Sequence, residues 1–412
     1  MVTATPSANP APAGSGGRLA SLDALRGFTM FWILGADITV MALAGWIDIA
    51  PLRLAAHQVD HAAWAGFRFY DLIFPMFIFI TGVSLVFSLE KSLARDGRWT
   101  AVRHILVRTL VLFLLGILYN GGLVQAWPDV RLVGVLQRIA LAYGAAALLV
   151  VFCSARVRVI VAAGLLVGYW ALLTFVPIRD ITLERDAMAA RLGQERPAAE
   201  AVHALYEATG TTVTGRYEPG LNLTNHLDYL VVPGRMYDLY WDPEGLLSTL
   251  PAIATCLIGV MAGSWLRRRD RSEREKLVRL ALVGAACLAL GWLWHLQFPV
   301  VKKIWTSSFV LVAGGWSLLF LAVFAWIIDM RGWRGWCAPF VWIGMNPITL
   351  YLATALVDFG RIARMLAGGS IARGLDAALG AGASGFVLSL LVLLLLIAVA
   401  RFLHRRGIYL KV

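Results

Sequence analysis

The sequence predicts an all-α polytopic membrane protein with about ten transmembrane helices and one external lobe between the fifth and sixth. Of its 412 residues 59% are hydrophobic and only 15% are charged, whereas soluble domains carry about 25% charged residues. Apolar runs long enough to cross a bilayer, which takes roughly 20 residues, recur along the chain. The 16 tryptophans and 11 tyrosines, many near the ends of these runs, are typical of interfacial belts.

The apolar runs divide the chain. Residues 1–17 are rich in Pro, Ala, Gly and Ser, so we expect them to be disordered and not a signal peptide. Residues 18–412 form one transmembrane domain, and the long loop at about 177–245 forms the external lobe, with one or two amphipathic helices in its centre. The ten predicted spans are 20–40, 72–89, 104–120, 132–152, 158–176, 246–266, 278–297, 306–329, 338–357 and 384–403.

The distribution of basic residues predicts the orientation. With the N-terminus inside, the inside segments hold 21 Lys and Arg and the short outside loops hold 8. The long loop is discounted because long loops translocate largely regardless of charge. Both termini are therefore expected in the cytoplasm, and the lobe outside. The net charge of +12 follows from these basic loops, so we expect the lipid bilayer and no nucleic acid as a partner.

The segment HQVDHAAWAGFRFYDLIFP, at 57–75, gathers ionisable residues on the outside, directly before the second span. His61 is the best candidate for a general base or nucleophile, because histidine titrates near neutrality. Asp37 and Asp71 are candidates to orient it, since the loop can fold back over the span ends. Asp71 equally suits a helix N-terminus, and His61 can equally decorate an exposed loop.

Charged residues inside spans are costly and indicate function or pairing. Asp23 and Arg26 lie three residues apart in the first span and can form a salt bridge. Asp37 follows Asp23 by about four helical turns and shares its face. Arg138, beside Gln137 in the fourth span, keeps its charge and must meet an anion or water. Its partner is either a carboxylate such as Asp23 or an anionic ligand.

Two further stretches carry polar groups near the spans. Asn346, with Pro347, interrupts the ninth span, which is tolerated only against protein or a cavity. Asp242 and Glu244 precede the sixth span, where they suit a helix cap, yet they lie on the same outside face as His61. The four cysteines show neither metal-site spacing nor a disulfide pattern. We therefore expect no metal.

Five stretches in a fixed order resemble one family. The chain is similar, from about residue 18 to its end, to the heparan-alpha-glucosaminide N-acetyltransferases, and nearest to their bacterial NagX-like amino-sugar branch. The lobe at 185–220 is the poorest match. The resemblance is carried by RLASLDALRGFTMFWILG, HAAWAGFRFYDLIFPMFIFITGVSLVFSL, VGVLQRIALAY, WDPEGLLSTLPAIATCLIGVMAG and WIGMNPITLYL.

This resemblance implies an enzyme that moves acetyl from cytoplasmic acetyl-CoA to the amine of a glucosamine unit on the far, periplasmic side. It implies His61 as the active-site histidine, in the pattern filled by His61, Trp64, Gly66, Asp71 and Pro75. The family's lysosomal member has an asparagine where this chain has Asp37. An aspartate there can hold an imidazolium or take a proton, whereas an asparagine can only hydrogen-bond.

The expected site follows from both arguments. His61 acts as the base or carries the acetyl group, oriented by Asp37 or Asp71. Candidate coenzyme-binding residues are Arg26, Gln137, Arg138 and Asn346. Candidate substrate-binding residues are Trp64, Asp242 and Glu244.

Two other functions fit the same pattern. The same base can activate a hydroxyl, which would make the protein an O-acetyltransferase of a cell-envelope glycan. The alternative outside enzymes is a sugar transporter, although the two matched broken helices typical of many transporters are not found. We expect a bacterial inner-membrane protein, and the resemblance suggests a homodimer.

Overall fold

The structure, a computed structural model, describes residues 19–410, and their regular secondary structure is almost entirely helical. The predicted disordered segment 1–17 lies outside the described residues. The α-helices and β-strands are α1 (Ala20–Phe31), α2 (Asp37–Trp46), α3 (Ala50–Gln58), α4 (Ile73–Tyr119), α5 (Val135–Phe152), α6 (Ala155–Phe175), β1 (Ile178–Arg179), α7 (Arg185–Leu192), α8 (Ala199–Ala208), β2 (Thr212–Val213), α9 (Leu223–Val231), α10 (Thr249–Leu266), α11 (Glu273–His295), α12 (Ser307–Phe324), α13 (Ala338–Met345), α14 (Pro347–Leu356), α15 (Phe359–Ala367), α16 (Ser370–Leu379) and α17 (Ala383–Arg405). Short 3₁₀ or π turns lie at Trp32–Ala36, Phe69–Leu72, Gly122–Val124, Trp127–Asp129, Ala325–Met330 and Gly335–Cys337.

The predicted class, an all-α polytopic membrane protein, is confirmed. Eight helical segments of the described chain are long and apolar enough to cross a membrane, or nine with the bent pair α13–α14. One of the eight, Phe69–Tyr119, has 51 residues, so it would be about 75 Å long if straight, far beyond a hydrocarbon core of about 30 Å. It breaks at Gly97, where φ is 77° and ψ is 172°. Counting its two arms separately, and the bent pair α13–α14 as one span, gives the ten spans that the sequence predicts.

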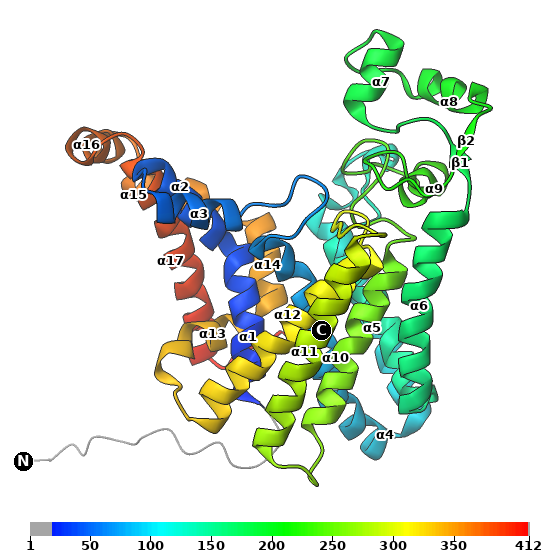
Figure 1. The fold of residues 1–412 in the computed structure, drawn as a ribbon. Coiled ribbons are helices and arrows are strands. Elements are labelled where there is room, and N and C mark those ends of the chain that lie inside the picture. Colours follow the sequence, from blue (N-terminus) through cyan, green and yellow to red (C-terminus); the bar gives the residue numbers. More distant parts are fainter. Residues whose placement is uncertain (1–18, 411–412) are drawn as a thin grey trace, which may run out of the picture.

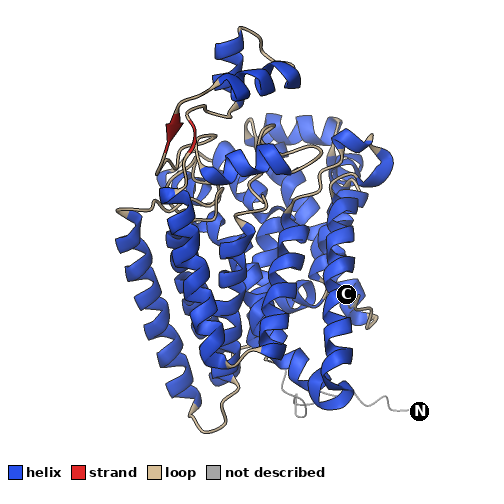
Figure 2. Ribbon diagram, turned by 90° about the vertical axis from the view of Figure 1, so that its right-hand side faces the viewer, coloured by secondary structure: helices blue, strands red, loops and turns tan. Residues whose placement is uncertain are grey.

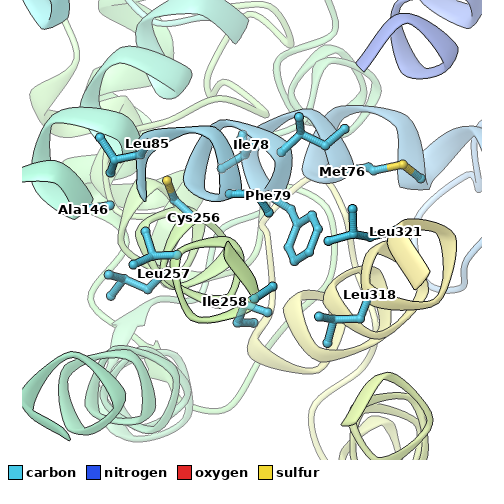
Figure 3. Close-up of a cluster of buried hydrophobic side chains, with 14 of the residues drawn as sticks. Met76, Ile78, Phe79, Leu85, Ala146, Cys256, Leu257, Ile258, Leu318 and Leu321 are labelled. Atoms are coloured by element: carbon cyan, nitrogen blue, oxygen red, sulfur yellow. The ribbon is translucent and has the colours of Figure 1, made fainter. Parts of the chain in front are cut away.

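Glycine contacts bring the central helices together. An added Cβ at Gly259 of α10 would lie 2.0 Å from the carbonyl oxygen of Phe79, and one at Gly82 would lie 2.0 Å from that of Cys256. Only glycine allows this approach, as in other close contacts of membrane helices. Figure 3 shows the resulting core, in which side chains of the first arm of α4 interdigitate with those of α10 and α12.

The lobe and a group of short helices cover one end of the bundle (Figures 1 and 2). The lobe contains α7, α8, α9 and the antiparallel pair β1–β2, which confirms the expected helices in its centre. At the same end of the bundle, but on the other side of it from the lobe, lie α2, α3, α15 and α16 (Figure 1). We call this end the lobe face. The loop that follows α3 crosses it between the two groups (Figure 1).

The opposite end is the basic face. Here Arg267, at the end of α10, pairs with Glu90 on the first arm of α4. This pair brings the Gly97 turn and the basic stretch 267–276 to the same end of the bundle. The charge asymmetry expected from the sequence therefore separates two physical faces.

Two spans are less regular than predicted. The first bends at Gly35, whose φ of 112° interrupts the helix within a π-helical turn, so that Asp37 begins the separate helix α2. The ninth bends by 67° between α13 and α14, at the Asn346–Pro347 interruption that the sequence indicates.

Candidate active site

His61 lies on the loop between α3 and α4, on the lobe face. Its Nδ1 is 2.8 Å from Oδ1 of Asp71. The His61 side chain is 47% exposed, whereas that of Asp71 is 1% exposed. A carboxylate can only accept, so the contact with Asp71 favours the tautomer with a proton on Nδ1 and Nε2 as the basic nitrogen. The pair therefore joins a buried carboxylate to an imidazole that solutes can reach.

Asp71 serves the local fold with its other oxygen. Oδ2 accepts from the backbone N–H of Arg68, 3.1 Å away, and from that of Ala62, 3.2 Å away. The cap interpretation and the catalytic interpretation of Asp71 are thus compatible, because each uses a different oxygen. The backbone contacts fix the carboxylate, which in turn fixes the His61 ring.

Lys302 completes this cluster and was missed by the sequence analysis. Its Nζ lies 3.1 Å from Nδ1 and 3.2 Å from Nε2 of His61, and 3.6 Å from Oδ1 of Asp71. Burial lowers the pKa of the Lys302 ammonium, and the carboxylates of Asp71 and Glu244 act in the opposite direction. One signal was available: Lys302 and Lys303 form a basic pair in a short loop that was assigned to the poorly basic outside.

Asp37 reaches the cluster only through a neighbour. The Tyr70 hydroxyl interacts with the Asp37 carboxylate, and the Tyr70 ring packs against the His61 ring with centroids 4.8 Å apart. Among the described residues no hydrogen bond joins Asp37 to His61 directly. Of the two carboxylates proposed to orient His61, the structure therefore brings Asp71 into contact and leaves Asp37 one residue further away.

A series of cavities leads from the basic face toward this cluster. The first, of about 620 Å³, lies between the two arms of α4 and includes Ser92, His104 and Arg108. It shares Arg108 and Tyr143 with a second cavity of about 310 Å³. The second is lined by two arginines, Arg26 and Arg108, and by three hydroxyl side chains of α4, without any carboxylate. Such a lining suits an anion.

The series narrows on the lobe side. A third cavity shares Phe77 and Ile139 with the second, has a wholly apolar lining and measures only about 20 Å³, enough for about one water. Phe74 lines it, one helical turn from Asp71. The series therefore ends close to the carboxylate that holds His61.

Comparison with known proteins finds one family match and similar curated proteins. Residues 18–171 match a family described as a domain of unknown function (DUF5009). The heparan-alpha-glucosaminide N-acetyltransferase of Homo sapiens is 27% identical over 328 residues, which is 71% of this chain and 48% of that protein. The Mus musculus protein of the same name is 25% identical over 72% of this chain and 49% of its own length.

The chain is thus similar to the heparan-alpha-glucosaminide N-acetyltransferases of these two organisms. It spans about half the length of the curated relatives it matches. The resemblance noted from its five motifs is thereby confirmed. The family match ends at residue 171 and so contains His61 and Asp71 but not Lys302.

The four predicted coenzyme residues lie in different settings. Arg26 lines the second cavity, where it donates to Asp23 at 3.1 Å and to Ser84. Arg138, 1% exposed, stacks on Trp305 with its Cζ 4.8 Å from a ring centroid, and donates to Ser248. Among the described residues its Nε and Nη1 have no acceptor. Among the described residues Arg138 forms no ion pair with Asp23, which pairs with Arg26 instead.

Gln137 and Asn346 line none of the described cavities. Gln137 is 2% exposed and packs against Gly116 and Gly134, and neither amide atom has a partner among the described residues. Asn346 donates from Nδ2 to the carbonyl of Ile408 at 3.0 Å and accepts from the N–H of Leu410 at 3.3 Å. It holds the C-terminal segment, and Leu410 lines the first and second cavities.

The predicted substrate residues also separate into two groups. Asp242 and Glu244 both accept from Arg131, at 2.7 to 2.8 Å, so their carboxylates are engaged within the protein. Trp64 lies beside a separate cavity next to His61. Among the described residues no group of three or more His, Cys, Asp or Glu side chains is placed to hold a metal ion.

Proposed function

We propose that the protein is a transmembrane acetyltransferase. It takes acetyl from acetyl-CoA, which enters from the basic face, and transfers it to the amine of glucosamine or a glucosamine-containing sugar on the lobe face. The observation that carries this proposal is the series of cavities, which is lined by Arg26 and Arg108 and ends one turn from the Asp71–His61 pair. The name that the human and mouse relatives share, heparan-alpha-glucosaminide N-acetyltransferase, supports the same chemistry.

The ends of the cavity series match the parts of this donor. Arginine side chains bind phosphate groups well, and Arg26 and Arg108 line the middle of the series. The apolar gap beyond them suits an uncharged arm. The gap admits about one water in the described conformation, so the α1, α4, α5 and α14 side chains around it have to part for an arm to pass.

In the proposed reaction the amine nitrogen attacks the thioester carbonyl carbon. His61 Nε2 takes the proton that the amine loses, while Asp71 holds the proton on Nδ1 and stabilises the charged ring. The carbon–sulfur bond then breaks and the sulfur leaves as a thiol after receiving the proton. The Lys302 ammonium lies where it can stabilise the negative charge that develops on the carbonyl oxygen. A route in which His61 Nε2 first accepts the acetyl group uses the same atoms.

We propose that the basic face is cytoplasmic, as the positive-inside rule favours. The protein is then an inner-membrane enzyme of a bacterium whose termini both lie inside the cell and whose site opens to the periplasm.

The test is transfer from labelled acetyl-CoA to glucosamine by the purified protein in detergent. We expect His61→Ala to lower kcat by about 10²–10⁴-fold, the usual contribution of a general base, and to bind acetyl-CoA normally. His57→Ala, an exposed histidine on α3, serves as the matched control and should keep parental activity. Near-parental turnover in His61→Ala would exclude the proposed role of His61.

A further inference from the structure

A fourth cavity, of about 460 Å³, lies on the lobe face between the His61 loop and the lobe. It combines three aromatic side chains, Trp64, Tyr237 and Trp241, with three carboxylates, Glu184, Asp186 and Asp238. Arg185 and Lys303 are the only cations in its described lining. In a chain with a net charge of +12, a cavity with more carboxylates than cations is a local reversal of charge.

Polar groups of this lining have unused hydrogen-bonding capacity. Oδ2 of Asp238 is buried and accepts no hydrogen bond from the described residues. Nε1 of Trp241, a side chain that is 2% exposed, is also buried and finds no acceptor among them. Burial raises the pKa of Asp238, whereas the nearby Lys303 lowers it. A buried carboxylate oxygen without a donor is costly, and a cationic ligand would relieve that cost.

The backbone that presents these groups is strained. Leu239, between Asp238 and Tyr240, has a φ of 72°, which is unfavourable for a residue with a branched side chain. The turn is closed by hydrogen bonds from the Asp238 N–H to the Trp241 carbonyl and from the Tyr240 N–H to the Asp238 carbonyl. Strain of this kind persists where surrounding structure enforces it, and it is concentrated at functional sites.

The cavity adjoins His61 but does not contain it. Ala63, two residues after His61, lines it, and two residues span at most about 7 Å. On the facing turn, Lys302 contacts His61, whereas the next residue, Lys303, lies over the Trp241 ring with Nζ 5.8 Å from the centroid. A sugar amine at His61 would therefore sit outside the cavity, and a sugar unit linked to it would sit inside.

We propose that this cavity is an acceptor subsite that binds a second, unacetylated amino-sugar unit, so that the preferred acceptor is an oligomer of glucosamine and not the monomer. The inference rests on the proposed function. Trp64 and the exposed Tyr237 offer faces on which a sugar ring and its ammonium can pack. Asp238, Asp186 and Glu184 offer acceptors for that ammonium. The lobe, which resembles the family least, thus sets the choice of acceptor.

The experiment compares glucosamine with its unacetylated β-1,4-linked dimer, using the full chain in detergent. For the parent we expect a KM for the dimer about tenfold below that for the monomer, a value within the range of a hydrogen bond to a charged group. Asp238→Asn should remove this difference and leave kcat with the monomer unchanged. Lys303→Gln should lower the KM for the dimer further, because it removes a competing cation.

The control is Glu200→Gln, which removes an exposed carboxylate on α8 outside the cavity and should retain the parental preference. Calorimetric binding of the dimer without acetyl-CoA gives a readout that is independent of transfer. Equal KM values for the monomer and dimer in the parent would overturn the subsite and leave the acetyltransferase proposal intact. Dimer binding that Asp238→Asn weakens, in a protein that transfers no acetyl group, would retain the subsite and refute the proposed function. If Asp238→Asn lowered kcat with the monomer as much as kcat with the dimer, Asp238 would have a structural role, and the subsite would also be overturned.

Discussion

Lys302 is separated from His61 by 241 residues, yet its Nζ lies within 3.2 Å of both ring nitrogens. His61 and Asp71 could be proposed from the sequence because they are close in the chain and stand in a recognisable pattern. Lys302 could not, because only the packing of the turn before α12 against the His61 loop brings it there. The hydrogen bond from the Gly66 N–H to the Val300 carbonyl, 2.8 Å long, fixes that packing.

Replacing Lys302 tests whether its charge assists the reaction. Lys302→Met keeps the length of the side chain and should lower kcat by about 10²–10³-fold, the usual cost of losing an oxyanion donor. Lys302→Arg keeps the charge and should retain more activity. Saturating kinetics of acetyl transfer provide the measurement, and an unchanged kcat in Lys302→Met would contradict the role.

The pH profiles of the parent and of Lys302→Arg give an independent test. Burial lowers the pKa of Lys302, so the ammonium of the parent loses its proton at a lower pH than an ordinary lysine. Activity of the parent should therefore decline as pH rises through that lowered pKa. The arginine variant cannot lose its proton in this range, so its profile should lack the decline. Identical alkaline limbs would argue against this assignment.

The elements were predicted where hydropathy alone determines them. The ten apolar runs and the interruption at Asn346–Pro347 correspond to structure. The bend at Gly35 was not foreseen, because a glycine within an apolar run is compatible with a straight helix. The short helices α3, α15 and α16 were also missed, since they lie in segments too short or too polar to span. α15 and α16 depend on the ends of the spans beside them.

The close contact between α4 and α10 predicts that a larger residue at Gly259 lowers the stability of the protein. Gly259→Ala places a methyl group 2.0 Å from the Phe79 carbonyl oxygen, so the helices must separate. Overpacking of this kind costs about 1–3 kcal/mol, and thermal unfolding in detergent should show a lower Tm. Gly164→Ala is the matched control, because an added Cβ on that α6 residue meets nothing within 4 Å. Equal Tm values for the two variants would show that the contact is not tight.

Helix α9 carries a buried carboxylate whose titration should affect stability. Asp228 is fully buried, and burial raises its pKa to about 7, compared with about 3.9 in an unfolded chain. The folded state therefore binds this proton more tightly. The resulting stabilisation is present below about pH 4 and is lost as pH rises to about 7.

Asp228→Asn removes this titration while keeping an acceptor for the Leu246 N–H, which lies 3.0 Å from Oδ1. The Tm of the variant minus that of the parent should become more positive between pH 5 and pH 8. Glu200→Gln, on the exposed side of the lobe, should show no such trend. A difference in Tm that is constant over this range would contradict the raised pKa.

At the scale of the whole molecule, the two faces divide the proposed reaction. The basic stretch at 267–276 and the Gly97 turn lie at one end, and His61, Lys302 and the lobe lie at the other. The sequence predicted this polarity from its Lys and Arg distribution, because charge placement in short loops responds to topology more than to packing. The cavity series was not predictable, since its walls come from helices distant in the chain.

The orientation can be tested in cells with a membrane-impermeant maleimide. Glu200→Cys, on the lobe, should be labelled in intact spheroplasts of the expressing cells. Ser272→Cys, on the basic face, should be labelled only after the membrane is permeabilised. The parent chain, whose four cysteines lie in or beside the spans, gives the background. The opposite pattern would reverse the proposed direction of acetyl transfer.

The hydrogen bonds between Asn346 and the segment 408–410 bear on the rate of turnover. Leu410 lines both cavities nearest the basic face, so a spent donor that leaves by that route has to pass it. The two hydrogen bonds between Asn346 and this segment, one donated by Asn346 and one accepted by it, then hold the exit closed. Breaking of these two hydrogen bonds, and not the chemistry at His61, would limit the turnover rate whenever acetyl transfer is faster than the release of the coenzyme.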